Sequence, residues 1–112
     1  MITLDGLKAL GADTDSGVAR CVNDEQFYLR MVGMALQDAN FEQLKESIEG
    51  GDLAKAFEQA HALKGVMGNV ALTSLYEPIA AMTEELRAGN EIDYTDYLNQ
   101  IFTELEKYRA LL

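Results

Sequence analysis

Hydrophobic positions recur every three or four residues along nearly the whole chain, and no long stretch alternates apolar and polar residues. A period of three to four places apolar side chains on one face of a helix, whereas alternation is typical of a half-buried strand. The clearest example follows Asp93, where the apolar positions are Tyr94, Leu98, Ile101, Leu105, Tyr108 and Leu112. The pattern therefore predicts an all-α protein.

The N-terminal third predicts two short helical pieces and one longer helix. We expect a helix over residues 4–10 that ends at Gly11, and a short helical turn after Asp15. The letters NDEQ, beginning at Asn23, have the form of a capping box, in which the asparagine caps a helix and the glutamine reaches back to it. The apolar face predicted for this helix consists of Phe27, Met31, Met34 and Leu36.

Caps and glycines also divide the rest of the chain. We expect a helix over residues 41–49 that ends at a glycine pair, and Asp52 is a natural N-cap for the helix that follows. The letters SLYE, beginning at Ser74, have the form of a second capping box. Pro78 would then fall at the fourth helical position, where it removes only the first intrahelical hydrogen bond.

The composition agrees with one compact bundle. The chain has 112 residues, of which 48% are hydrophobic and 25% charged, so it can form a single core. Short connections make neighbouring long helices antiparallel. We therefore predict one domain over residues 1–112, an antiparallel up-down four-helix bundle with additional short N-terminal helices.

The sequence also indicates the cellular compartment in which the protein is expected. The apolar runs are too short to span a membrane, and no basic stretch precedes an apolar segment at the N-terminus. Cys21 is the only cysteine and has no internal partner, which agrees with a reducing compartment. We expect a soluble, cytoplasmic protein and, because nothing in the sequence demands a dimer, a monomer.

The formal net charge of −10 disfavours some classes of binding partner and favours others. A surface with 19 acidic and 9 basic residues repels phosphate backbones, so we expect no nucleic-acid partner. Such a surface can steer a basic protein face towards the chain, although acidic surfaces also serve solubility alone. The sequence has no glycine-rich nucleotide loop of a recognised type, so we expect no use of ATP.

The candidate chemistry lies in AHALKGVMGN, residues 60–69, which contains the only histidine. On a helical wheel of about 100° per residue, the apolar positions of this helix are centred opposite His61. A histidine with a structural role in the core would have to face those positions. The wheel therefore predicts that His61 faces solvent.

Phe57, Lys64, Gly65 and Gly68 all lie within about 60° of His61 on that wheel. Each glycine inside a helix costs about 0.5–1 kcal/mol relative to alanine. Because these two glycines face outward, we interpret them as bare backbone that a macromolecule can approach closely. Lys64 would bring positive charge to an anion attached at His61. Phe57 is either an exposed docking contact or a side chain that leans under the neighbouring helix.

The stretch HALKG resembles the H-x-L-K-G motif of histidine-containing phosphotransfer (HPt) domains of multistep phosphorelays, which His61, Leu63, Lys64 and Gly65 match. The stretch GADTDSGVARCVNDEQFYLRMV, residues 11–32, is also similar to the N-terminal region of that family. The resemblance implies that His61 accepts a phosphoryl group from the aspartyl phosphate of a receiver domain and relays it to another receiver aspartate. Lys64 would stabilise the charge of the phosphoryl oxygens.

The resemblance also implies the partners, which are response-regulator receiver domains and a sensor (hybrid) histidine kinase. Phe57, Gly65 and Gly68 would contact the partner. The chain would be a phosphocarrier without kinase activity of its own and without a metal or cofactor, because the Mg²⁺ belongs to the receiver. The chain departs from the family at Ala71, where many members carry a second glycine, and at Pro78, which is unusual so near a helix start.

Three other functions have some support in the sequence. Glu58 and His61 have the Glu-x-x-His spacing of di-iron bundles, but that site needs two inward pairs and the chain has one histidine. A nucleophilic hydrolase lacks a second base at a recognisable spacing. A helical adaptor that docks on a histidine kinase or a receiver domain without being phosphorylated stays open, since a docking surface can exist without the chemistry.

Overall fold

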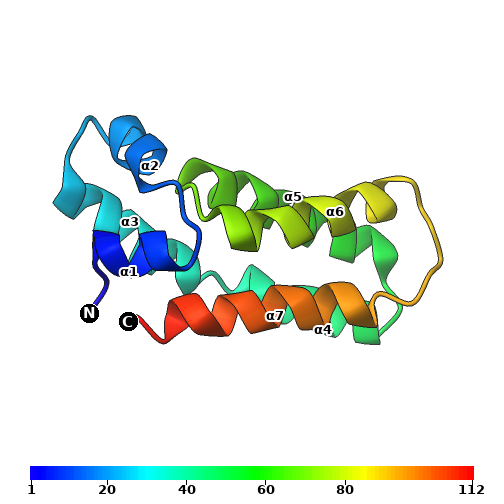
Figure 1. Ribbon diagram of the computed structural model, residues 1–112. Coiled ribbons are helices and arrows are strands. Elements are labelled where there is room, and N and C mark those ends of the chain that lie inside the picture. Colours follow the sequence, from blue (N-terminus) through cyan, green and yellow to red (C-terminus); the bar gives the residue numbers. More distant parts are fainter.

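The computed structural model describes all residues, 1–112, and contains seven helices and no strand (Figure 1). The helices are α1 (Leu4–Ala9), α2 (Thr14–Arg20), α3 (Glu25–Leu36), α4 (Asn40–Glu49), α5 (Leu53–Asn69), α6 (Thr73–Arg87) and α7 (Thr95–Arg109). The prediction of an all-α protein is confirmed. No helix combines the length and the apolarity that crossing a membrane requires.

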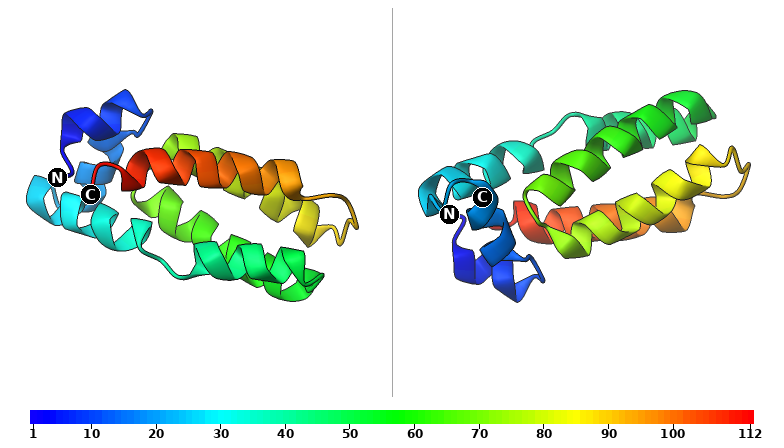
Figure 2. Two further views of the ribbon diagram at one scale, coloured as in Figure 1. Left: turned by 90° about the horizontal axis from the view of Figure 1, so that it is seen from below. Right: turned by 90° about the horizontal axis from the view of Figure 1, so that it is seen from above.

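The four helices α4 to α7 lie side by side and run in alternating directions along the long axis of the molecule (Figures 1 and 2). Tight turns at residues 50–52 and 70–72 join α4 to α5 and α5 to α6, and a longer loop joins α6 to α7. The short helices α1 and α2, together with α3, gather at the end where α5 stops and α6 starts. Both termini lie at that end, and the Met1 amino group is 3.5 Å from the Leu112 carbonyl oxygen.

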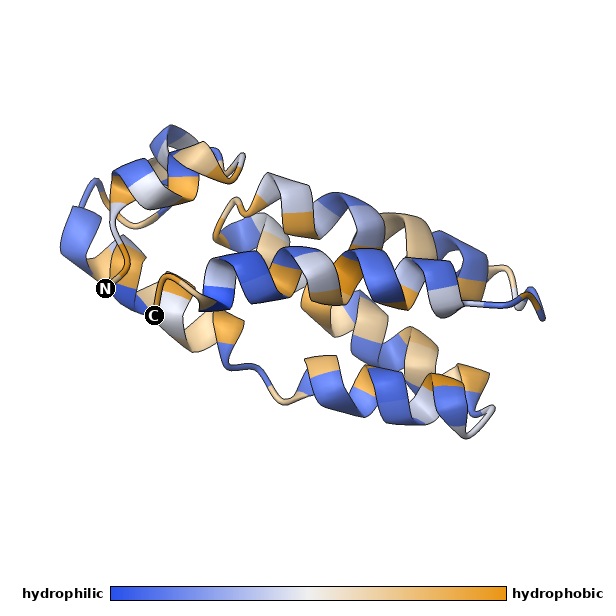
Figure 3. Cartoon of the chain, turned by 60° about the horizontal axis from the view of Figure 1, so that its bottom comes forward, coloured by the Kyte–Doolittle hydropathy of each residue, from blue (hydrophilic) through white to orange (hydrophobic).

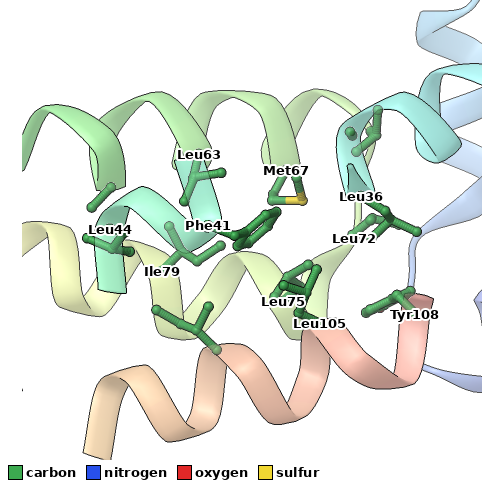
Figure 4. Packing of buried hydrophobic residues seen from close by; sticks show 14 of the residues in the cluster. Leu36, Phe41, Leu44, Leu63, Met67, Leu72, Leu75, Ile79, Leu105 and Tyr108 are labelled. Atoms are coloured by element: carbon green, nitrogen blue, oxygen red, sulfur yellow. The ribbon is translucent and has the colours of Figure 1, made fainter. Parts of the chain in front are cut away.

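One core of 24 buried residues runs through the bundle. Figure 4 shows apolar side chains of α3 to α7 converging between the helices, among them Phe41, Leu63, Ile79 and Leu105, which are fully buried. The outer sides of the helices, in contrast, carry hydrophilic residues (Figure 3). Burying each such side chain stabilises the fold by about 1.5–3 kcal/mol, so the hydrophobic stripes fix which face of every helix stays outside.

The predicted start of α3 is wrong, and its predicted apolar face is only partly correct, because Leu36 is buried and Met31 packs against the core whereas the other two positions are exposed. Asn23 has a φ of 60° and lies outside the helix, and Asp24 is the N-cap, with its carboxylate accepting a hydrogen bond from the Phe27 N–H at 3.1 Å. Phe27 and Met34 are 39% and 67% exposed. The buried residues of α3 are Tyr28, Val32, Ala35 and Leu36. The face is different because the ring of Tyr28, packed against α2, occupies the interior.

The second predicted capping box is also wrong. Helix α6 begins at Thr73, and the Ser74 hydroxyl donates to the Leu10 carbonyl oxygen at 2.8 Å instead of capping. Pro78 is therefore the sixth residue of α6, not the fourth. The helix has already made earlier backbone bonds by then, such as that from the Tyr76 N–H to the Leu72 oxygen at 2.8 Å. The proline removes one backbone hydrogen bond inside the second turn, and α6 continues through it to Arg87.

Candidate functional site

The outer face of α5 carries the candidate residues, and the start of α5 fixes its orientation. Asp52 is the N-cap, as predicted, and its carboxylate accepts from the Lys55 N–H at 3.1 Å. The residues of α5 that face the interior are Ala56, Ala60, Leu63 and Met67. His61 lies on the opposite side and is exposed. The predicted orientation of the imidazole is confirmed.

Phe57 supports the imidazole from one side. The two rings are stacked, with their centroids 5.7 Å apart and their planes inclined by 19°. Phe57 is only partly exposed, packs against the core, and has the guanidinium carbon of Arg87 5.2 Å from its ring centroid. Of the two alternatives that the sequence left open, the contacts favour a side chain that leans towards α6. The Phe57 ring thus contacts both the imidazole and the Arg87 guanidinium, and these three side chains form one edge of the site.

Lys64 follows His61 by about one helical turn, and its ammonium is directed to a carboxylate of α6. The Lys64 Nζ atom is 3.6 Å from Oε1 of Glu84, and 28% of the lysine side chain is exposed. The other carboxylate oxygen of Glu84 lies 3.5 Å from Nε of Arg87. Glu84 and Arg87 could not be singled out from the sequence, because no local pattern indicates which residues of α6 lie opposite α5.

The two glycines of the motif have different surroundings. A Cβ atom added to Gly65 would meet nothing within 4 Å, so the prediction of bare, open backbone is confirmed there. A Cβ atom added to Gly68 would lie 3.4 Å from a ring carbon of Tyr76. The Gly68 carbonyl oxygen also accepts a 2.6 Å hydrogen bond from Arg20 of α2. The interpretation of Gly68 as bare backbone is therefore wrong on the side where α2 and α6 pack against the end of α5.

A groove of about 610 Å³ opens beside the imidazole, between the end of α5, the start of α6 and α2. His61, Lys64 and Gly65 line it from α5, and Arg20 lines it from α2. Most of its other lining residues are polar, including Asp13, Ser16, Asn69 and Thr73. Two cationic side chains therefore border the space into which an anion on His61 would project. Arg20 stands within the N-terminal stretch that resembles the family, but the sequence alone assigned it no role.

The chain does not gather three or more histidine, cysteine, aspartate or glutamate side chains into a group that could hold a metal ion. The only histidine stacks on an aromatic ring instead of facing the carboxylates that a di-iron bundle requires. The site geometry is thus that of an exposed nucleophilic ring with cations nearby. Such a site can take up an anionic group from an approaching macromolecule.

Comparison with known proteins agrees with this geometry. Residues 30–111 match the Hpt domain family, a range that contains α4 to α7 and most of α3 but neither α1 nor α2. No match was found among curated proteins or among solved structures. Hpt domains are phosphocarriers without kinase activity of their own, and they interact with receiver domains and histidine kinases. The chain therefore belongs to the Hpt domain family and has a phosphotransfer-related role in phosphorelay signalling.

Proposed function

We propose that His61 accepts a phosphoryl group from the aspartyl phosphate of a receiver domain and passes it to an aspartate of another receiver. The observation that carries this proposal is the outward imidazole of α5, with a lysine one turn further on and open backbone at Gly65. The remaining groups that the chemistry requires, including Mg²⁺, belong to the receiver.

The chemistry suits a neutral imidazole whose proton resides on Nδ1. The lone pair of Nε2 attacks phosphorus, the N–P bond forms, and the bond from phosphorus to the aspartate oxygen breaks with its electron pair leaving on the carboxylate. Loss of the Nδ1 proton to solvent then leaves a neutral ring that carries the phosphoryl group. Donation to the next aspartate runs through the same steps in reverse.

Lys64 and Gly65 have separate roles in this proposal. The ammonium of Lys64, once turned away from α6, offsets the negative charge on the phosphoryl oxygens during transfer. Gly65 presents backbone without a side chain, so the receiver can bring its aspartate close enough for in-line attack. Phe57 limits rotation of the imidazole by stacking on it.

The direct test mixes the protein with candidate receiver domains, one at a time, each phosphorylated beforehand with a small-molecule phosphodonor. We expect a phosphate on the wild-type chain that is labile to acid and stable to base. We expect none on His61→Gln, whose circular dichroism should match that of the wild type because the side chain is exposed. Acid-labile, base-stable phosphate on the variant would refute the assignment, and a wild-type chain that binds receivers but takes no phosphate would indicate an adaptor.

Two further variants test the supporting residues. Lys64→Ala should slow transfer by about 10- to 100-fold without unfolding the domain, the range expected when one hydrogen bond to a charged group is lost. An unchanged rate would remove the role given to Lys64.

Gly65→Leu should weaken receiver binding by obstruction, and equal affinity for the receiver would count against the open-backbone argument.

A further inference from the structure

Glu84 on α6 lies between two cations beside the imidazole and uses both of its carboxylate oxygens. Its Oε1 is 3.6 Å from Lys64 Nζ, and its Oε2 is 3.5 Å from Arg87 Nε. Arg87 in turn covers Phe57, on which His61 stacks. These five side chains link α5 to α6 around the reactive ring. The lysine that should serve the phosphoryl group is thus engaged elsewhere while His61 is unmodified.

We propose that Glu84 is a positioning residue that holds Lys64 while His61 is unphosphorylated and releases it to the phosphoryl group when His61 is modified. The inference rests on the proposed function and adds a control over how tightly the site retains phosphate. Lys64 lines the same groove as His61, so a rotation of its flexible side chain takes the ammonium from α6 to the phosphoryl oxygens. A phosphoryl group is the stronger competitor because it carries more negative charge than a carboxylate.

Movement of Lys64 from Glu84 to the phosphoryl group leaves no buried charge without a partner. The side chain of Glu84 is 60% exposed, so water hydrates its carboxylate when Lys64 leaves. Arg87 stays beside the other carboxylate oxygen, which keeps Glu84 paired in both states. An exposed ion pair contributes little to stability, and its loss therefore does not endanger the fold.

The consequence is a bias in the transfer equilibrium. Acceptance forms the N–P bond on His61, breaks the aspartyl P–O bond and separates Lys64 from Glu84. Donation to a receiver reverses all three changes. Glu84 therefore lowers the tendency of His61 to retain the phosphoryl group and favours its passage to the next aspartate.

The experiment measures the equilibrium distribution of phosphate between one receiver and the chain, by separating phosphorylated from unphosphorylated protein. Glu84→Gln keeps the size of the side chain and removes its charge. We expect the equilibrium to shift towards phosphohistidine by about two- to fivefold, the range set by one exposed ion pair. The matched control is Glu85→Gln, which removes the same charge from a neighbouring carboxylate that accepts from Asn90 at 2.9 Å. The control should behave as the wild type.

A second pair of variants distinguishes positioning from a general charge or folding effect. In a Lys64→Met background, Glu84→Gln should produce no further shift, because the ammonium that it positions is absent. A shift that persists in that background, or one of equal size in Glu85→Gln, would overturn the proposal, as would a wild-type equilibrium in both Glu84→Gln and Glu84→Ala. Absence of any phosphate on the wild-type chain would refute the proposed function itself, so the two failures are distinguishable.

Discussion

Gly17 and Gly65 are both helical glycines, but the space around them differs. A Cβ atom on Gly17 would overlap a ring carbon of Tyr28, whereas Gly65 has open space. The Tyr28 hydroxyl donates to the Val70 carbonyl oxygen at 2.8 Å, so the ring is fixed between α2, α3 and the end of α5. Gly17 thus permits the close approach that holds α2 beside the His61 groove.

We expect Gly17→Ala and Gly65→Ala to change stability in opposite directions. Gly17→Ala should lower the free energy of unfolding by about 1–3 kcal/mol, because Tyr28 cannot move without losing its buried hydrogen bond. Gly65→Ala should raise it by about 0.5–1 kcal/mol through helix propensity. Urea denaturation followed by circular dichroism measures both. A Gly17→Ala protein as stable as the wild type would refute the assigned contact.

At the same scale, the orientation of His61 could be predicted from the sequence, whereas the partners of its neighbours could not. The apolar positions of α5 follow one regular period, and a regular period fixes the outer face. The pairing of Lys64 with Glu84 and the hydrogen bond from Arg20 to Gly68 join different helices. Such contacts depend on how helices pack, and a helical wheel describes one helix at a time.

At the scale of elements, α5 and α6 end with the same hydrogen-bond pattern. Beyond α5, the Leu72 N–H donates to the Met67 oxygen at 3.1 Å and the Ala71 N–H to the Gly68 oxygen at 3.2 Å. This pattern places one residue in the left-handed region, and glycine is favoured there. That residue is Gly89 after α6, with a φ of 72°, but it is Ala71 after α5, with a φ of 56°. The departure at Ala71 therefore imposes backbone strain beside the groove.

Exchanging the residue types at these two ends tests that interpretation. Ala71→Gly should raise the free energy of unfolding by about 0.5–1 kcal/mol, since glycine adopts a positive φ without a steric penalty. Gly89→Ala is the matched control and should lower it by about 1 kcal/mol, because its added methyl meets nothing within 4 Å and only the backbone term remains. Thermal or urea unfolding of both variants gives the comparison, and a destabilised Ala71→Gly would contradict the assignment of strain.

Helix starts were harder to predict than helix ends. The prediction of Asp52 as the N-cap of α5 is correct because Asp52 directly follows a glycine pair that ends α4. At the start of α3, two adjacent residues can both cap, and Asn23 is used in the left-handed turn after α2, which leaves the cap to Asp24. Ser74 has a suitable side chain for a cap, but its hydroxyl bonds instead to Leu10 and Tyr108. In both cases the side chain or the backbone that would form the predicted cap takes part in a tertiary contact or a turn instead.

At the scale of the whole molecule, α1, α2 and part of α3 lie outside the residues that match the family, yet α2 and its cap residue Asp13 form one wall of the groove. Arg109 near the end of α7 joins α7 to the junction of α3 and α4. Its Nε donates to the Leu36 carbonyl oxygen at 2.8 Å, and its Nη1 donates to Glu42 at 2.8 Å. Its guanidinium also lies over the ring of Phe41, 5.6 Å from the centroid. One side chain thus connects three helices at the end of the bundle where both termini lie.

This connection makes part of the stability depend on pH. The hydrogen bond from Arg109 lowers the pKa of Glu42 below its usual value. A carboxyl whose folded pKa is depressed contributes stability that is present above the unfolded pKa, near 4.5, and is lost as the pH falls through the folded pKa. We therefore expect acidification below about pH 5 to destabilise the wild type more than Glu42→Gln, which has no carboxylate to protonate at this position.

Urea denaturation at a series of pH values from neutral to acidic measures this difference. The carboxylate is largely exposed, so solvent screening should keep the difference between the two pH profiles within about 1 kcal/mol. Glu46→Gln on the same face of α4 is the matched control, since it removes the same charge from the acidic molecule without touching Arg109. Its profile should parallel that of the wild type, because the general relief of repulsion on protonation is common to all three proteins. Parallel profiles for the wild type and Glu42→Gln would mean that Arg109 connects the helices through Leu36 and Phe41 alone.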